Sequence, residues 1–215
     1  TRLAQLTRSD ECLSQVALET LERALERRER REPLSHILGV WSFWGLEFFV
    51  DARVLTPRPD TEVLVEEALA WLNARLKHQE MEGDQGVKGD QGALTEVIDV
   101  CAGSGCVGLA LLSERPLKLT LSELSGEAFE VLRRNHTTLL QQGALKGKAT
   151  LCQGDLLTPL PAHVRPDLIV SNPPYICPTE LSELMPEVRD YEPLLALDGG
   201  AEGGSFRPDS LEKTG

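Results

Sequence analysis

The stretch VIDVCAGSGC, residues 97–106, decides the fold of this 215-residue chain. Its first four residues are typical of a buried strand, its two glycines indicate a tight turn, and the apolar residues 107–112 indicate the helix that follows. This unit opens a doubly wound nucleotide-binding α/β fold. Gly103 and Gly105 let the backbone approach a ligand, and the start of the helix offers unpaired N–H donors. Because many G-x-G turns only mark a strand-to-helix corner, a site must be argued from further residues.

Polar side chains follow each strand that the sequence predicts around this unit. Residues 117–121 indicate a second strand that leads to Glu123, about 20 residues after the turn, where such folds place a carboxylate that binds ribose hydroxyls. Ser125 then starts a helix. Residues 150–152 and 168–171 indicate the third and fourth strands. The four strand ends therefore carry Asp99, Glu123, Asp155 and Asn172. Any one of these could cap a turn, but four at one sheet edge indicate a site.

The fourth strand runs into NPPY, residues 172–175. Each proline fixes φ, lacks an N–H and keeps its predecessor out of the helical region, so Asn172 and Pro173 are held extended. The loop presents the Asn172 amide on a rigid support at the carboxyl end of a strand. Open α/β sheets bind ligands at that edge.

The first sixty residues predict a helix and a hairpin. Ser9 and Asp10 are plausible N-caps of a helix whose apolar positions are Leu13, Val16, Leu21, Ala24 and Leu25. Its charged end, residues 26–32, favours a solvated helix end over an RNA contact, because glutamates separate the arginines. The apolar alternation of residues 41–50 around Gly45, followed by residues 52–56, suggests a hairpin.

A second helix is predicted to begin at Asp60, its candidate N-cap. Its expected apolar face is Val63, Leu64, Ala68, Leu72 and Leu76. Residues 80–96 contain the tetrapeptide GDQG twice, at 83–86 and 89–92, and almost no apolar side chains. Such a composition cannot offset its ordering entropy, so the sequence predicts a flexible surface loop there.

Composition restricts the classes of function. The formal charge of −12 and the pI near 4.8 oppose a general nucleic-acid or anionic-membrane surface. No stretch approaches the ~20 apolar residues of a membrane span. Five cysteines without a C-x-x-C motif and four scattered histidines predict reduced thiols in an intracellular protein and no metal site.

The motifs resemble those of a known family. The matching segments are residues 32–34, 37–39, 43, 45–46, 48, 57–62, 99–105, 154–155, 169–175, 191–193 and 196–197. Together they resemble the HemK/PrmC family of S-adenosylmethionine-dependent methyltransferases, which methylate the glutamine amide nitrogen in the Gly-Gly-Gln motif of peptide release factors. The NPPY loop alone suggests amino-group methylation in general, and the motifs at Glu32 and Pro57 make the resemblance specific.

The resemblance implies a class I, Rossmann-like sheet and a role for each motif. Asn172, Pro173, Pro174 and Tyr175 are then catalytic. The cofactor-binding set is Asp99, Cys101, Ala102, Gly103, Ser104, Gly105, Glu123, Asp155, Leu156 and Asn172. Residues 101–105 would wrap the amino-acid part of S-adenosylmethionine, Glu123 would hold its ribose, and Asp155 and Leu156 would lie near its adenine. Members often carry tryptophan in place of Leu156 and aspartate in place of Glu123. Arg58 and Asp60 are expected to shape the substrate mouth.

The resemblance also implies domain boundaries. Residues 1–40 correspond to part of a helical substrate-recognition domain, 41–56 to a linking hairpin, and 57–207 to a methyltransferase domain with a loop at about 80–95. Residues 208–215 depart from the pattern, and the strands that should follow are missing. We therefore expect a splice or fragment form of weak or no activity, whose fourth strand is an exposed edge. The match looks closest to the mitochondrial type, with a cytoplasmic location as the alternative.

Three functions stay open on the sequence. The first is methylation of a release-factor glutamine, with the release factor as protein partner and no direct contact to nucleic acid or membrane. The second is a nucleic-acid adenine N6-methyltransferase, since an exocyclic amine suits the same loop. The third is an inactive module that at most binds the cofactor. The oligomeric state and the particular release factor are not encoded in these patterns.

Overall fold

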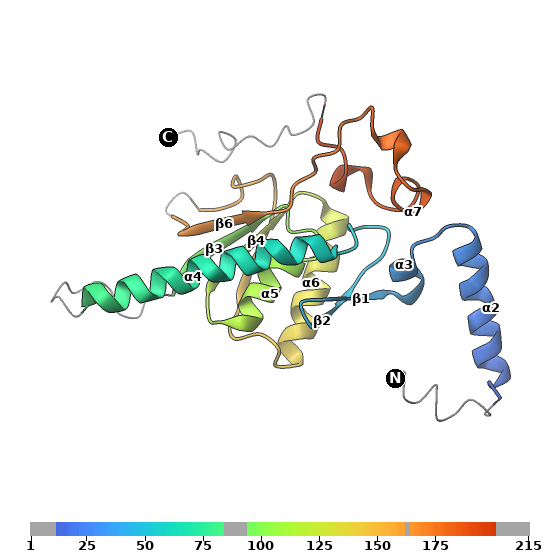
Figure 1. Cartoon of the computed structure of the whole chain (residues 1–215), viewed down its shortest axis with the longest axis horizontal. Helices are drawn as coiled ribbons and strands as arrows, with labels where there is room; N and C mark the ends of the chain where they lie inside the picture. Colours follow the sequence, from blue (N-terminus) through green and yellow to red (C-terminus); the bar gives the residue numbers. More distant parts are fainter. Residues whose placement is uncertain (1–11, 84–93, 162–163, 201–215) are drawn as a thin grey trace.

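Four parallel strands form the central sheet, in the spatial order β5-β4-β3-β6. A computed structural model describes residues 12–83, 94–161 and 164–200 (Figure 1). The strands are β3 (Glu96–Val100), β4 (Lys118–Glu123), β5 (Ala149–Gln153) and β6 (Leu168–Ser171). Their register pairs Asp99 with Leu121 on one side and with Val170 on the other. The strands predicted from the sequence are confirmed, and their carboxyl ends meet at one edge.

Three helices pack on one face of this sheet: α4 (Glu62–Gly83), α5 (Cys106–Glu114) and α6 (Gly126–Gln141). Figure 1 shows α4 lying across the strands. Within β3, Val97 belongs to the core cluster beneath these helices, whereas Ile98 and Val100 pack with Leu157 and Leu160 on the opposite face. This alternation is the period of two that a strand imposes. Both faces of β3 are therefore buried, as its apolar run predicts.

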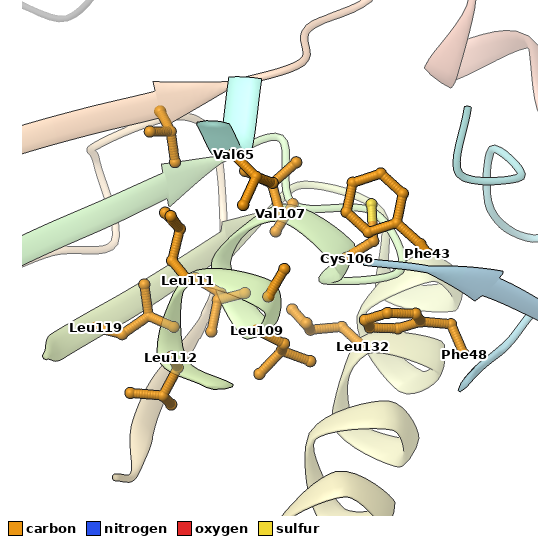
Figure 2. Close-up of a cluster of buried hydrophobic side chains, with 14 of the residues drawn as sticks. Phe43, Phe48, Val65, Cys106, Val107, Leu109, Leu111, Leu112, Leu119 and Leu132 are labelled. Carbon is orange, nitrogen blue, oxygen red and sulfur yellow. The ribbon is translucent and has the colours of Figure 1, made fainter. Parts of the chain in front are cut away.

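A hairpin packs against the helix side of the sheet. It consists of β1 (Val40–Phe43) and β2 (Leu46–Phe49), and its turn residues Trp44 and Gly45 have φ of 52° and 71°. Phe43 and Phe48 are almost fully buried, with their ring centroids 6.3 Å apart in an edge-to-face arrangement. Figure 2 shows them beside Leu132 and Cys106. Burial of such a ring contributes about 1.5–3 kcal/mol. The predicted hairpin is confirmed, but residues 52–56 form no strand.

The amino-terminal helix projects away from the sheet (Figure 1). It is α2 (Gln15–Glu29), its N-cap is Ser14, and the short helix α3 (Leu34–Leu38) follows. The proposed caps Ser9 and Asp10 lie outside the described residues. The predicted apolar positions are not buried: Leu13, Val16, Leu21 and Leu25 are 45–71% exposed. The charged end is solvated as predicted, since residues 26–31 are exposed, and Arg28 and Arg31 also pair with Glu187.

The predicted cap of α4 is wrong, because Asp60 lies in a 3-10 turn, η1 (Pro59–Thr61), whose N-cap position is Arg58, and no side chain caps it. The predicted apolar face is confirmed in part. Ala68 and Leu72 are buried and Leu64 packs against the core, whereas Val63 is 55% and Leu76 42% exposed and Val65 is buried instead. The helix continues to Gly83, so residues 80–83 are helical, and Glu96 belongs to β3. The rest of the predicted loop, residues 84–93, lies outside the described residues.

The chain after β6 folds over the carboxyl edge of the sheet. It forms η2 (Leu181–Glu183), α7 (Pro186–Arg189) and η3 (Leu194–Ala196). Ile176 then pairs with Asp198 in an isolated parallel bridge, with Ile176 N donating to Leu197 O and Gly199 N donating to Ile176 O, both at 2.9 Å. Residues 193–199 are thereby held beside the NPPY loop.

Candidate active site

The turn between β3 and α5 needs left-handed backbone at three positions. Cys101, Gly103 and Gly105 have φ of 58°, 54° and 82°. A Cβ on Gly105 would lie 2.4 Å from Leu132 Cδ1, whereas one on Gly103 would meet no atom within 4 Å. Gly105 is therefore required by packing, and Gly103 leaves open space on the side where a ligand can approach.

The Glu123 carboxylate organises this turn. Its Oε2 accepts a hydrogen bond from Gly103 N at 2.8 Å, and its Oε1 accepts one from Ser125 N at 2.9 Å. The residue is 8% exposed. Each carboxylate oxygen can accept a further bond, so a ribose hydroxyl can still be held here. Glu123 thus links two turns at the sheet edge in addition to the ligand role predicted from the sequence.

Asp99 lies beneath the turn, where it holds helix α5. Its Oδ2 accepts a bond from Gly108 N at 2.8 Å, and a Cβ on Gly108 would lie 3.0 Å from that oxygen. Burial raises the pKa of Asp99 to about 7, and the nearby Glu123 carboxylate adds to the rise. The bond to α5 is a structural function that the sequence pattern did not reveal.

A first cavity of about 350 Å³ opens at this edge of the sheet. It collects nine of the ten predicted cofactor-binding residues: Asp99, Cys101, Ala102, Gly103, Ser104, Glu123, Asp155, Leu156 and Asn172. Gly105 does not line it, because this residue packs under Leu132 and Leu109. Leu156 has a φ of 47°, and its carbonyl accepts a bond from Ser122 Oγ at 2.5 Å.

Sequence reasoning missed much of this cavity wall. Residues 53–55 with Pro57 and Thr61 line it, and so do Pro193, Leu195 and Ala196 with 198–199. The motifs at Pro57 and Tyr191 lie next to these residues, and that proximity was the available signal. Both segments reach the cavity only because the chain folds back over the strand ends.

The first cavity suits a cationic nucleoside such as S-adenosylmethionine. Its wall carries the carboxyl groups of Asp99, Glu123, Asp155 and Asp198 against one guanidinium, that of Arg53. The Gly103 backbone leaves space beside it, and Glu123 retains acceptor capacity for ribose hydroxyls. Burial raises the pKa of the Cys101 thiol to about 11, which keeps it protonated at neutral pH.

A second cavity, of about 480 Å³, adjoins the first and shares Leu55, Thr61, Asn172 and Ala196 with it. Its wall includes Ser171, Pro173, Tyr175 and Ile176, together with Arg58 and Asp60. Asn172 lines both cavities, Pro174 lines only the first, and Tyr175 lines only the second. Tyr175 is 67% exposed. The structure therefore places Asn172 between two binding spaces.

The acceptor groups of the loop have no partner within the described part of the chain. No hydrogen bond there involves the Asn172 side chain or the Pro173 carbonyl. Neither atom is fully enclosed, since both residues are half-buried. Two oxygens on a proline-stiffened support are thus available to accept the two N–H groups of a planar amide or amine.

Within residues 12–83, 94–161 and 164–200, no group of three His, Cys, Asp or Glu side chains could hold a metal ion. Among these residues, too, no helix combines the length and the apolar character that a membrane crossing requires. The five cysteines carry free thiols.

The fold and this site resemble those of class I methyltransferases. Residues 88–185 match the family model "Methyltransferase small domain", and residues 1–39 match "PrmC N-terminal domain". The chain is 42% identical over 193 residues to the release factor glutamine methyltransferase of Caulobacter vibrioides, covering 89% of this chain and 59% of that one. It is 41% identical to that of Geobacter sulfurreducens, covering 92% and 61%.

The relatives that the chain resembles are named release factor glutamine methyltransferases, and the amino-terminal match is to the PrmC N-terminal domain, in line with the HemK/PrmC family that the motifs resemble. The chain spans about three fifths of the length of these relatives. Among solved structures, the human Mettl16 catalytic domain with an RNA hairpin is 14% identical with a TM-score of 0.47, covering 72% of this chain and 51% of that chain. A likeness of that degree carries no argument about the substrate.

Proposed function

We propose that this chain carries the active site of a protein-glutamine methyltransferase. It transfers a methyl group from S-adenosylmethionine to the side-chain nitrogen of the glutamine in the Gly-Gly-Gln motif of a release factor. The observation that supports this proposal best is the position of Asn172, which lines both cavities and has unpartnered acceptors beside it. A transferase needs its donor and acceptor to meet at one such point.

The loop oxygens activate and orient the acceptor. An amide nitrogen is a poor nucleophile, because its lone pair is delocalised into the carbonyl group. The Asn172 Oδ1 and the Pro173 carbonyl each accept one N–H of the target amide. They fix its plane and stabilise the positive charge that develops on nitrogen as the new N–C bond forms. Bound S-adenosylmethionine supplies an electrophilic methyl group, and the acceptor nitrogen then loses a proton to solvent.

The remaining residues bind and position. By resemblance, residues 101–105 surround the amino-acid part of the cofactor, Glu123 holds its ribose, and Leu156 packs on its adenine. Holding the reacting atoms in line contributes most of the acceleration, as it does in other two-substrate reactions. Tyr175 lies in the second cavity and so would form a wall for the acceptor amide. No general base is needed, since nitrogen deprotonation follows methyl transfer.

Labelled S-adenosylmethionine tests the proposal. The chain is incubated with a release factor, with the same factor carrying Gln→Ala in its Gly-Gly-Gln motif, and with adenine-containing single-stranded DNA. We expect label only in the unmodified factor. Label in DNA would establish the adenine alternative, and label in the Gln→Ala factor would move the reaction to another side chain. A mitochondrial location stays a prediction.

A further inference from the structure

A buried carboxylate lies behind the second cavity. Glu192 is 6% exposed, and its side chain is 1% exposed. Its Oε2 accepts a bond from Arg58 Nη2 at 2.6 Å, and its Oε1 accepts one from Thr56 N at 3.3 Å. These partners lie more than 130 positions earlier in the chain. Glu192 therefore ties the carboxyl-terminal segment to the segment between the hairpin and α4.

The segment that Glu192 binds, residues 56–60, forms part of the second cavity. Arg58 and Asp60 both line that cavity, and Thr56 Oγ1 is further fixed by Ser35 Oγ at 2.9 Å. The Arg58 side chain is 40% exposed, so one edge of its guanidinium meets Glu192 while the remainder reaches the open space. The geometry of Arg58 is thus set by a carboxylate that no ligand can contact directly.

The side chains of Arg58 and Asp60 have hydrogen-bond donors and acceptors that no protein group uses among the described residues. A guanidinium has five N–H donors. Among the described residues, Arg58 donates only from Nη2, and the Asp60 carboxylate accepts no hydrogen bond. The cavity therefore presents several donors and one carboxylate acceptor near each other. A peptide main chain offers the complement, with carbonyl oxygens and N–H groups that alternate along the chain.

The charge at this position disfavours a phosphate backbone. Arg58 and Asp60 are the charged residues in the described wall of the second cavity. The Arg58 charge is matched by Glu192, so Asp60 leaves the local balance negative. Phosphate binding depends on uncompensated cations. The donors therefore favour neutral carbonyl groups over the anions of a nucleic acid.

We propose that Glu192 is a positioning residue that holds Arg58 so that its free N–H groups, with the Asp60 carboxylate, hydrogen-bond the main chain flanking the acceptor glutamine. This inference rests on the proposed function. Burial raises the pKa of Glu192 although the Arg58 guanidinium opposes the rise, so the carboxylate is held at a cost to folding. Main-chain recognition by these two groups would select a polypeptide acceptor over a nucleobase.

The variant Glu192→Gln tests the proposal, because glutamine has nearly the same size but removes the charge and replaces one of the two acceptor oxygens with an NH2 donor. Binding of a release factor and of S-adenosylmethionine is measured separately by calorimetry with the full 215-residue chain. We expect Glu192→Gln and Arg58→Gln each to weaken release-factor binding at least tenfold and to change S-adenosylmethionine affinity less than twofold. Because both act through Arg58, the double variant should bind no more weakly than Arg58→Gln alone. Glu130→Gln, which breaks the exposed pair with Arg133, is the matched control and should change neither affinity.

Three results would contradict the proposal. If Glu192→Gln binds the release factor as the parent chain does, the inference is wrong while the proposed function stands. Additive losses in the double variant would show that Glu192 acts independently of Arg58. If Glu192→Gln unfolds, Arg58→Gln carries the test, since its side chain is partly exposed. A parent chain that neither binds nor methylates the release factor would refute the proposed function, and this inference with it.

Discussion

The two cavities on either side of Asn172 are built in different ways. The first is held by hydrogen bonds between residues that are close in sequence: Asp99 to Gly108 spans 9 positions, Glu123 to Gly103 spans 20, and Ser122 to Leu156 spans 34. The second depends on Glu192, whose bonds to Arg58 and Thr56 span 134 and 136 positions. Segments distant in sequence line both cavities, but the bonds that fix the turns of the first cavity are short in sequence, whereas the bonds that fix Arg58 in the second are long.

This difference predicts how the two sites respond to change. Local turns form at a small entropic cost, whereas long-range contacts form only when distant segments have already docked. Segments held by few such contacts open more readily than core strands. We therefore expect the first cavity, where S-adenosylmethionine would bind, to tolerate substitutions better than the second, where the acceptor would bind. Four substitutions test this comparison, beginning with Asn172, which lines both cavities.

Asn172→Ala should separate chemistry from donor binding. Removal of the amide takes away one preorganised acceptor, and such losses cost about 10²–10³ in rate. We expect methyl transfer to fall by about that factor, with S-adenosylmethionine affinity changed less than about threefold. Single-turnover transfer and calorimetry measure the two quantities. Asn73→Ala on the exposed face of α4 is the control. Loss of both quantities would mean that Asn172 belongs to the donor site or to the fold.

Asp99→Asn should change how stability depends on pH. The folded-state pKa of about 7 lies above the ordinary 3.8, so between these values the folded chain retains a proton that the unfolded chain has released. The free energy of unfolding therefore falls as pH rises through this window, by about 4 kcal/mol. Asparagine can still accept the Gly108 N–H but does not titrate. Urea unfolding across the window should show a flatter profile for the variant, and parallel profiles would contradict the assignment.

Glu123→Ala should damage the donor cavity alone. Two backbone N–H groups would lose their acceptor, and each unsatisfied group costs about 1–3 kcal/mol when buried. We expect S-adenosylmethionine binding to weaken about 10- to 100-fold and release-factor binding to stay within about twofold. The exposed Glu127→Ala is the matched control. If the affinities for both ligands fell equally, the two cavities would not respond separately to substitution.

Leu156→Trp should give the smallest effect, and a favourable one. Stacking of an aromatic side chain on a base contributes about 1–3 kcal/mol, and leucine already supplies part of that contact. We expect S-adenosylmethionine to bind about three- to tenfold more tightly, measured by calorimetry beside Leu140→Trp on the exposed surface of α6. Unchanged or weaker binding would place the adenine away from Leu156.

Sequence periodicity succeeded where a segment is buried and failed where burial depends on a distant partner. The apolar run of β3 predicted a buried strand, and Ile98 and Val100 are almost fully buried. The apolar spacing of α2 predicted an apolar face, yet Val16 is 71% exposed, because spacing identifies a stripe without supplying what covers it. In α4 the predicted Ala68 and Leu72 are buried, but Val65 is buried in place of Val63.

The donor side of this protein was determined by the sequence itself. Its glycine turn and its proline-stiffened loop follow from local backbone rules, and the carboxylate about 20 residues later follows from the spacing of the strand-turn-helix unit. The tertiary structure alone decided that Asp99 holds α5, that Gly105 serves packing, and that Glu192 reaches Arg58. The first two depend on how α5 and α6 pack on the sheet, and the third joins residues 134 positions apart when the chain closes over the carboxyl edge of its sheet.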